Sequence, residues 1–161
     1  MRRVEVYIAT ELNEKLGARL RAAASQISVI AYLVTPNSSP LRHGHPSLLR
    51  TMREIGHHPI DCRMILATSN KSPGLNEANV RVAEILTADK WRVRFAPPYP
   101  LAHCKIWIFD AAYAVVGSHN LTTPGLTANN DISIGIDHPD IIARLRNFYD
   151  ELWDKSRHHQ R

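Results

Sequence analysis

Short apolar runs that alternate with stretches of helical periodicity constrain the fold of this chain most. The clearest run is 27–34, which is rich in β-branched and aromatic residues and too short for an ordinary helix. The Pro- and Ser-rich segment 35–40 stops it, which is typical of a buried strand followed by a turn. Similar runs predict strands at 4–9, 60–67 and 91–95.

Three amphipathic segments separate these strands. The apolar residues of each segment recur at the spacing of one face of a helix. They are Leu12, Leu16, Leu20 and Ala23 in the first segment, Leu48, Leu49, Met52 and Ile55 in the second, and Leu75, Ala78, Val82 and Leu86 in the third. Thr10 is expected to cap the first helix and Gly56 to close the second. Alternating strands and helices of this kind predict an α/β fold.

The second half of the chain differs in pattern. Apolar runs at 101–109 and 113–116 flank a short polar turn and predict an antiparallel hairpin, and 132–136 is expected to be the last strand. Pro139 opens a terminal amphipathic helix. We therefore predict a single-domain mixed β-sheet flanked by helices on both faces over residues 1–154, followed by a basic C-terminal tail at 155–161 that frays.

Composition and charge narrow the function classes. The 161 residues, 44% hydrophobic and 22% charged, suit one globular domain and exclude a disordered chain. A formal net charge of +5 favours a polyanionic partner such as nucleic acid, although a solvated basic surface would give the same value. Two cysteines exclude a disulfide framework, and no apolar run is long enough to cross a bilayer, so we expect a cytoplasmic protein without membrane insertion.

The predicted hairpin carries the candidate chemistry. His103 and Lys105 are two residues apart, so on a strand both side chains leave the same face, while Cys104, Ile106 and Ile108 are expected to face the core. On the returning strand Ser118 and Asn120 follow Gly117, where a missing side chain permits close approach of the backbone. An imidazole, a fixed cation and neutral donors on one patch suit phosphodiester cleavage.

These residues resemble the signature of the phospholipase D superfamily. That signature is a His, any residue, Lys, four residues and Asp, followed by Gly-Ser-x-Asn, and it is matched here by His103, Lys105, Asp110 and then Gly117, Ser118 and Asn120. Asp131 matches the position at which many members carry Glu. The resemblance implies a phospholipase D-like fold and a metal-independent reaction through a phosphohistidine, with no cofactor.

The resemblance also implies a role for each residue. His103 is the expected nucleophile, with Lys105, Ser118 and Asn120 binding phosphate oxygens, Asp131 orienting the imidazole, and Asp110 and Gly117 serving the structure of the motif. The chain holds one such motif where the reaction needs two, so the resemblance implies a homodimer in which His103 of the second copy is the general acid. Single-motif bacterial endonucleases of this superfamily are similar in size.

Several assignments and functions stay open at this point. The loop 35–46 follows a central strand, and its Arg42 and His43 are expected to contact substrate phosphate. His119 is expected to face away from the motif, and the His-rich segments at 43–45 and 57–58 lack convincing metal-ligand spacing. The leading hypothesis is an endonuclease acting on DNA or RNA; the alternatives are a phospholipid hydrolase or phosphatidyl transferase, and a non-catalytic nucleic-acid-binding module.

Overall fold

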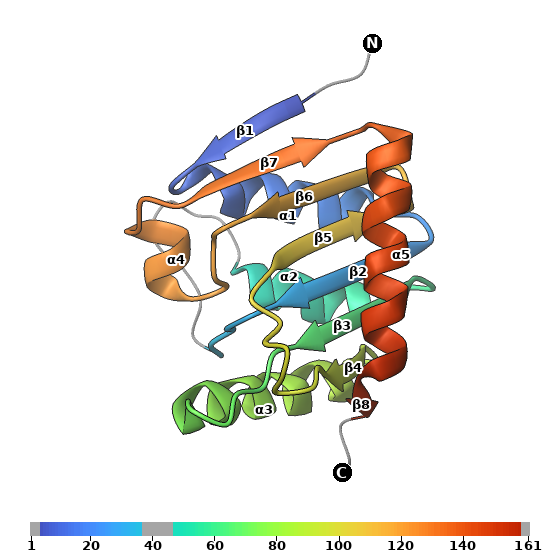
Figure 1. The fold of residues 1–161 in the computed structure, drawn as a ribbon. Helices are drawn as coiled ribbons and strands as arrows, with labels where there is room; N and C mark the ends of the chain where they lie inside the picture. The colour runs from blue at the N-terminus through green and yellow to red at the C-terminus, as the bar shows by residue number, and fades with distance from the viewer. Residues whose placement is uncertain (1–3, 37–46, 159–161) are drawn as a thin grey trace.

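A mixed β-sheet forms the centre of the computed structural model, which describes residues 4–36 and 47–158 (Figure 1). Within these residues the sheet has eight strands in the order β1-β7-β6-β5-β2-β3-β4-β8. The strands are β1 (Val4–Ile8), β2 (Gln26–Ala31), β3 (Asp61–Leu66), β4 (Arg92–Phe95), β5 (Lys105–Phe109), β6 (Tyr113–Gly117), β7 (Ile132–Ile136) and β8 (Arg157–His158).

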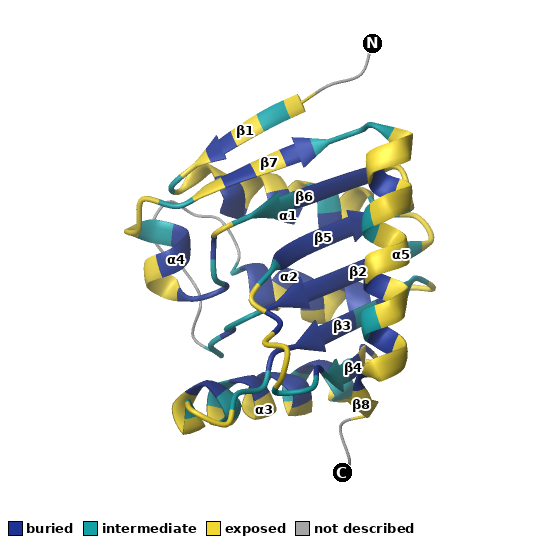
Figure 2. Ribbon diagram, in the orientation of Figure 1, coloured by how far each residue is buried: buried dark blue, intermediate teal, exposed yellow. Residues whose placement is uncertain are grey.

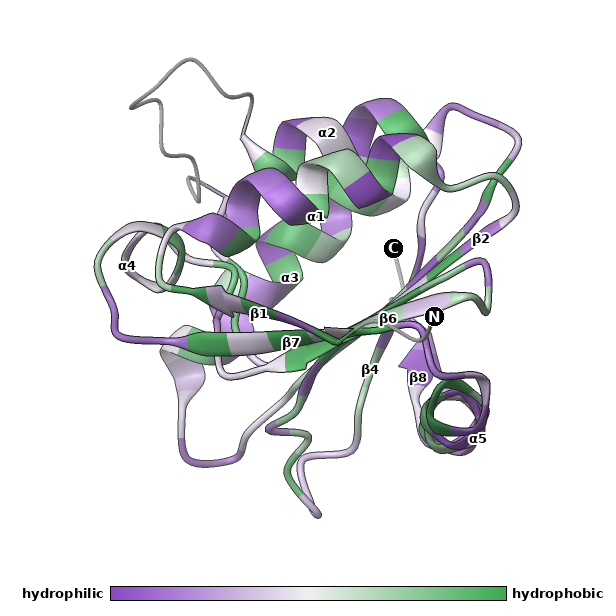
Figure 3. Ribbon diagram, turned by 90° about the horizontal axis from the view of Figure 1, so that it is seen from above, coloured by the Kyte–Doolittle hydropathy of each residue, from purple (hydrophilic) through white to green (hydrophobic). Residues whose placement is uncertain are grey.

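Helices cover both faces of this sheet, as the sequence predicts. Seen along the sheet, the first three helices lie on one side and α5 lies on the other (Figure 3). The helices are α1 (Glu11–Ala22), α2 (Leu48–Gly56), α3 (Pro73–Ala88), α4 (Thr123–Thr127) and α5 (Pro139–Lys155). None of them, within the part of the chain that the structure describes, is long and apolar enough to cross a membrane.

The direction of the strands decides which loops meet. β2, β3 and β4 are parallel, because α2 and α3 return the chain between them, whereas β5 runs antiparallel to β2. The start of β5 therefore lies beside the carboxyl end of β2. β5, β6 and β7 form an antiparallel meander that β1 extends. The residues before β5 and after β6 consequently meet the end of β2 at one edge of the sheet.

Two hydrophobic cores hold the layers together. The first lies between the sheet and α1–α3, and the second lies between the sheet and α5. The prediction that β5 is buried on one face was incomplete: Ile106 and Ile108 belong to the second core, but Trp107 and Phe109, which share the parity of Lys105, belong to the first. The whole of β5 is buried (Figure 2). Lys105 is thus a charged residue on a strand that is buried on both faces.

Several boundaries differ from the predicted ones. β2 ends at Ala31 rather than at residue 34, and β5 begins at Lys105 rather than at residue 101. The helix α4 was not predicted, because five residues give too little periodicity. Residues 157–158 of the tail, which was expected to fray, form β8 and pair with Arg94 and Phe95 of β4.

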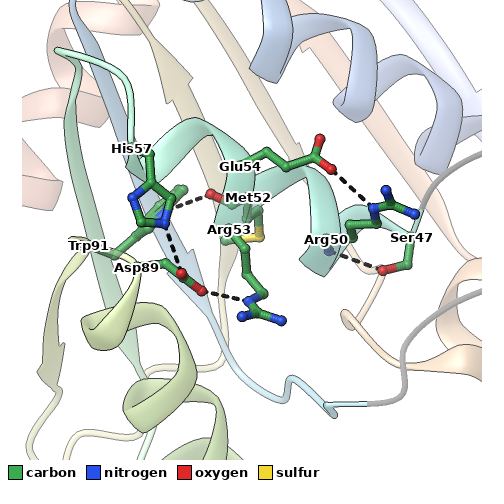
Figure 4. Close-up of polar contacts among 8 residues, drawn as sticks. All are labelled: Ser47, Arg50, Met52, Arg53, Glu54, His57, Asp89 and Trp91. Carbon is green, nitrogen blue, oxygen red and sulfur yellow. Dashed lines mark hydrogen bonds and ion pairs between the residues drawn. The ribbon is translucent and has the colours of Figure 1, made fainter.

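An ion-pair cluster fastens the carboxyl ends of α2 and α3 to each other (Figure 4). The Asp89 carboxylate accepts a hydrogen bond from Arg53 at 2.5 Å and lies 2.9 Å from Nε2 of His57. The Arg53 guanidinium, followed by His57, holds the pKa of Asp89 below its usual range. Gly56 is required here because a Cβ would overlap the carbonyl of Asp89. His57, which belongs to a segment without convincing metal-ligand spacing, therefore has a structural partner.

Candidate active site

Lys105 lies at the start of β5 and is almost fully buried, with 8% of its surface exposed. Its ammonium donates a hydrogen bond of 2.8 Å to the carbonyl oxygen of His103 and lies 3.5 Å from Nε2 of the same residue. Burial lowers the pKa of Lys105, and the nearby Asp131 acts in the opposite direction. The structure thus places the predicted imidazole and cation side by side.

His103 precedes β5 in the chain and is exposed to solvent. Its Nε2 lies 3.5 Å from the Lys105 ammonium, which can only donate hydrogen bonds. An imidazole nitrogen attacks phosphorus through its lone pair. The exposed position of His103 leaves its ring accessible to a substrate.

Tyr32, which sequence reasoning missed, completes this pair. Its ring meets the His103 imidazole edge-on with centroids 4.4 Å apart, and the Lys105 ammonium lies 5.0 Å from the centre of the Tyr32 ring. Tyr32 lies in the apolar run 27–34, which predicts a buried strand rather than a site. Its position one residue past the end of β2 is the signal that indicates a site residue, since ligands gather at the carboxyl ends of strands in α/β sheets.

Asn79 of α3 fixes the backbone that carries Tyr32. This fully buried amide donates to the carbonyl oxygens of Tyr32 and Ala67, both at 2.9 Å, and accepts a hydrogen bond of 3.0 Å from the Val34 amide. The chain therefore leaves the sheet after Ala31. A polar residue at position 79 on the apolar helix face of Leu75, Val82 and Leu86 was the available signal, and the sequence reading passed over it.

The second half of the motif lies just beyond β6. Gly117 pairs with Lys105, and a Cβ at Gly117 would overlap the side chain of Ser133, so only glycine fits. Ser118 then makes two hydrogen bonds with Ile132 of β7: its amide donates to the Ile132 carbonyl at 2.9 Å, and its side-chain Oγ accepts from the Ile132 amide at 3.1 Å. The Ser118 hydroxyl is exposed in this position.

Asn120 belongs to a loop that is held against the end of β2. The next residue, Leu121, donates to Leu33 and accepts from Thr35, both at 3.0 Å. Within the described residues, the Asn120 Oδ1 is buried and has no hydrogen-bond partner. An unpaired buried acceptor is costly, so this oxygen is a candidate to accept a hydrogen bond from a donor group of a bound molecule.

Asp131 makes its hydrogen bond with Ser118. Its Oδ1 accepts from the Ser118 hydroxyl at 2.6 Å, whereas the sequence predicts that it orients His103. Within the described residues, the structure shows no hydrogen bond between Asp131 and the imidazole. Asp131 is nonetheless close enough to Lys105 to act on its charge. The role of Asp131 in positioning His103 stays a prediction.

The remaining motif residues lie outside this patch. Asp110 accepts hydrogen bonds from the amides of Ala24, Ser25 and Gln26 and from the Ser25 hydroxyl at 2.8–2.9 Å, which ties the β5–β6 turn to the start of β2. His119 is buried against Ser133 and the Ala9 carbonyl and faces away from the motif. Arg42 and His43 lie outside the described residues. Among those residues, no group of three His, Cys, Asp or Glu is placed to hold a metal ion.

Known structures with the same fold come from several kinds of protein. Nuc from Salmonella typhimurium, a phospholipase D family member, matches with a TM-score of 0.80 at 16% identity over 99% of this chain and 100% of its own. NucT from Helicobacter pylori matches with 0.79 at 11% identity over 99% and 100%. Phosphatidylserine synthase from Haemophilus influenzae matches with 0.66 at 14% identity, over 91% of this chain and 36% of its own.

Comparison by sequence gives the family. No curated protein sequence matches the chain. The family model described as "Cardiolipin synthase, PLD-like domain" matches residues 16–153, a range that includes the complete motif from His103 to Asn120 and also Asp131. The match and the fold together confirm the resemblance read from the motif: this chain belongs to the phospholipase D-like family.

Proposed function

We propose that this protein is a nuclease that hydrolyses DNA or RNA without a metal ion, through a phosphohistidine on His103, in an active site shared by two copies. The observation that carries the proposal is the convergence of one imidazole, one buried ammonium and a hydroxyl–amide pair at a single edge of the sheet. Lys105 supplies a fixed charge for the phosphate oxygens, and Ser118 and Asn120 supply neutral groups.

The reaction has two balanced steps. The lone pair of His103 attacks phosphorus, and the bond from phosphorus to the leaving oxygen breaks as His103 of the second copy gives that oxygen its proton. Water then attacks phosphorus, the second imidazole takes a proton from it, and the phosphorus–nitrogen bond breaks. These 161 residues hold a single motif histidine, so the proposal assigns the general acid to a second copy.

The net charge supports a polyanionic substrate. The chain carries twenty Lys and Arg against fifteen Asp and Glu. Phosphate backbones attract such a surface whatever their base sequence, so weak sequence preference is expected. The similar structure of an archaeal chromatin protein with a described mode of DNA binding, at a TM-score of 0.65 and 14% identity, is consistent with a nucleic-acid partner.

Cleavage of end-labelled oligonucleotides in excess EDTA tests the proposal. We expect cleavage by the wild type and a loss of more than about 10⁴-fold in His103→Ala, because the substitution removes both the nucleophile and the general acid, and the acid alone contributes about 10²–10⁴-fold. His58→Ala removes an exposed histidine at the end of α2 and is the matched control, which should cleave normally. A wild type that cleaves only after Mg²⁺ is added would refute the mechanism.

A lipid substrate is the second candidate. The description of the family model and the similar phosphatidylserine synthase structure favour it, because both name enzymes of phospholipid synthesis. Incubation with a labelled phosphatidyl substrate separates the two functions. Release or transfer of the headgroup, together with intact oligonucleotides, would replace the nuclease proposal.

A further inference from the structure

An exposed aromatic side chain precedes the candidate nucleophile by four residues. Tyr99 is 87% exposed, more than any other large hydrophobic residue in the described part of the chain. Pro100 and Leu101 follow it and are exposed as well. Ala102 is buried, and His103 is exposed again. Three consecutive apolar residues at the surface therefore lead to the imidazole, and we call them the 99–101 strip.

The protein anchors this strip at both ends. Ala96 is buried before it, where the Ala96 amide donates to the Leu66 carbonyl at 2.9 Å and the Ala96 carbonyl accepts from the Thr68 hydroxyl at 2.7 Å. Ala102 is buried after it, in the second core. Three of the five residues between these anchors are prolines, which restrict the backbone. The backbone that carries Tyr99 is thus restrained before any ligand binds, which lowers the entropic cost of binding.

The strip lies at the edge of the sheet that carries the candidate active site. It belongs to the connection from the carboxyl end of β4 to the start of β5 (Figure 1). β4 is parallel to β3 and β3 to β2, so all three strands end at the edge where Tyr32 meets His103. Four residues of chain keep the Cα atoms of Tyr99 and His103 within about 14 Å of each other. A base on Tyr99 would therefore belong to a nucleotide within about four of the reacting phosphate, even at the ~3.4 Å per nucleotide of a duplex strand.

The chemistry of the strip selects an unpaired nucleobase. The strip holds no charged side chain, so it offers nothing to a phosphate, for which Lys105 already supplies the charge. The Tyr99 ring offers a flat aromatic face, on which any base can stack. In a duplex, both faces of a base are covered by its neighbours, so a side chain reaches them only by unstacking the helix. A strand with unpaired bases therefore fits the strip and the phosphate site together.

We propose that the 99–101 strip is a base-binding subsite, in which Tyr99 stacks on an unpaired base of the strand whose phosphate lies at His103 and Lys105. The inference rests on the proposed function, and it narrows the substrate of that function to single-stranded DNA or RNA. The subsite selects unpaired bases and not a sequence, because every base has a face that stacks. The stacked base adds affinity that a duplex cannot use.

Fluorescence anisotropy with labelled single-stranded oligonucleotides tests the subsite. The parent protein is His103→Ala, so that recognition is measured apart from cleavage. Adding Tyr99→Ala should weaken binding about 5–150-fold, the range for losing one stacked base, whereas adding Tyr99→Trp should keep it. On a strand of the same length built from abasic sugars, the parent and Tyr99→Ala should bind equally, because no base is left to stack. Thermal melting should be unchanged, since the Tyr99 side chain is exposed.

Cleavage provides the second measurement. In proteins that keep His103, Tyr99→Ala should lower kcat/KM for a single strand by the same factor and should leave the cleavage of a blunt duplex unchanged. Phe148→Ala removes an exposed aromatic ring from α5 and is the matched control. It should bind and cleave single strands as its parent does.

The outcomes separate the subsite from the proposed function. Binding that Tyr99→Ala leaves unchanged, or weakens equally for normal and abasic strands, would overturn the subsite. A shift from dimer to monomer in Tyr99→Ala, measured by sedimentation equilibrium, would overturn it in favour of a contact between copies. Binding that depends on Tyr99, beside a wild type that cleaves no nucleic acid, would support the subsite and refute the proposed function.

Discussion

Tyr32 touches both His103 and Lys105 through its ring alone. An aromatic edge contact and a cation–π contact are each worth roughly 1 kcal/mol. We therefore expect Tyr32→Ala to lower kcat/KM for oligonucleotide cleavage about 10-fold, whereas Tyr32→Phe keeps the ring and should stay near the wild type. Equal losses in both variants would instead assign the effect to the phenolic hydroxyl.

The buried ammonium of Lys105 predicts the alkaline limit of substrate binding. Burial lowers the pKa of Lys105, so the phosphate-binding charge should disappear at a lower pH than the ~10.4 of an ordinary lysine. Binding of an oligonucleotide to His103→Ala, which should not cleave it, should weaken on the alkaline side before that value. In the double variant Lys105→Arg/His103→Ala the guanidinium keeps its charge, so binding should be free of this alkaline loss. A parallel loss of binding in both proteins would contradict the assignment.

At the level of single residues, the sequence predicts which side chains lie together but not every hydrogen bond that they form. His103 and Lys105 lie together as expected, although His103 precedes β5 and so does not owe its position to strand parity. The hydrogen bond of Asp131 with Ser118 depends on how β7 lies against the end of β6, which is a tertiary arrangement without a local pattern. For the same reason Tyr32, which is more than seventy residues from His103 in the chain, has no motif to mark it.

The β5–β6 hairpin depends on Asp110 for its attachment to the rest of the sheet. Burial alone would raise the pKa of Asp110, but hydrogen bonds from Gln26, Ala24 and Ser25 outweigh it and hold the pKa below the usual value. A carboxylate whose pKa is lowered on folding stabilises the protein above its unfolded pKa of about 3.9 and loses that contribution as the pH falls through the folded value.

Asp110→Ala should therefore lower the free energy of unfolding at pH 7 by about 2–4 kcal/mol, because it leaves several amides unpaired. Asp110→Asn keeps one acceptor and should lose less. The difference between the wild type and Asp110→Asn in urea unfolding should shrink below about pH 3.9. Asp154→Asn, an exposed position on α5, should show no loss at any of these values.

α3 makes a comparable attachment through Asn79. Removing this fully buried amide would leave the Tyr32 and Ala67 carbonyls and the Val34 amide without their partner. We expect Asn79→Ala to lower the free energy of unfolding by about 2–4 kcal/mol and also to reduce cleavage, since Tyr32 loses its anchor. Glu77→Ala on the exposed side of α3 breaks only a surface ion pair and should cost less than about 1 kcal/mol. Unchanged unfolding of Asn79→Ala in urea would show that the ends of β2 and β3 hold without it.

The elements could largely be predicted because each long one carries a local pattern. The β-branched run of β2 and the helical spacing in α1, α2 and α3 are examples, and the structure confirms them. The end of β2 could not be predicted, because Asn79 from a distant helix draws Tyr32 and Val34 off the sheet. β8 is two residues long and exists through its pairing with β4.

Across the whole molecule, fewer positively charged side chains are available to a substrate than the net charge suggests. Arg63 and Arg92 both pair with Asp61, and Arg94 donates to the Trp153 carbonyl at 2.7 Å while lying over the Trp153 ring. These three arginines fasten β3, β4 and α5 together at the far side of the sheet from β1. All three are thus engaged with groups of the protein itself, and Lys105 is the cation that the structure places in the motif.

A shared active site makes a quantitative prediction for mixed dimers. If each reaction uses His103 from both copies, a dimer of one wild-type and one His103→Ala chain is inactive. After subunit exchange in an equal mixture, cleavage should then fall to about one quarter of that of the same total amount of wild type, because random pairing leaves that share of fully wild-type dimers. Independent sites would leave about one half under the same pairing. Mixing with His58→Ala chains, which keep His103, is the control: cleavage should equal that of the same total amount of wild type. A value near one half in the first mixture would show that one His103 completes the reaction within its own chain.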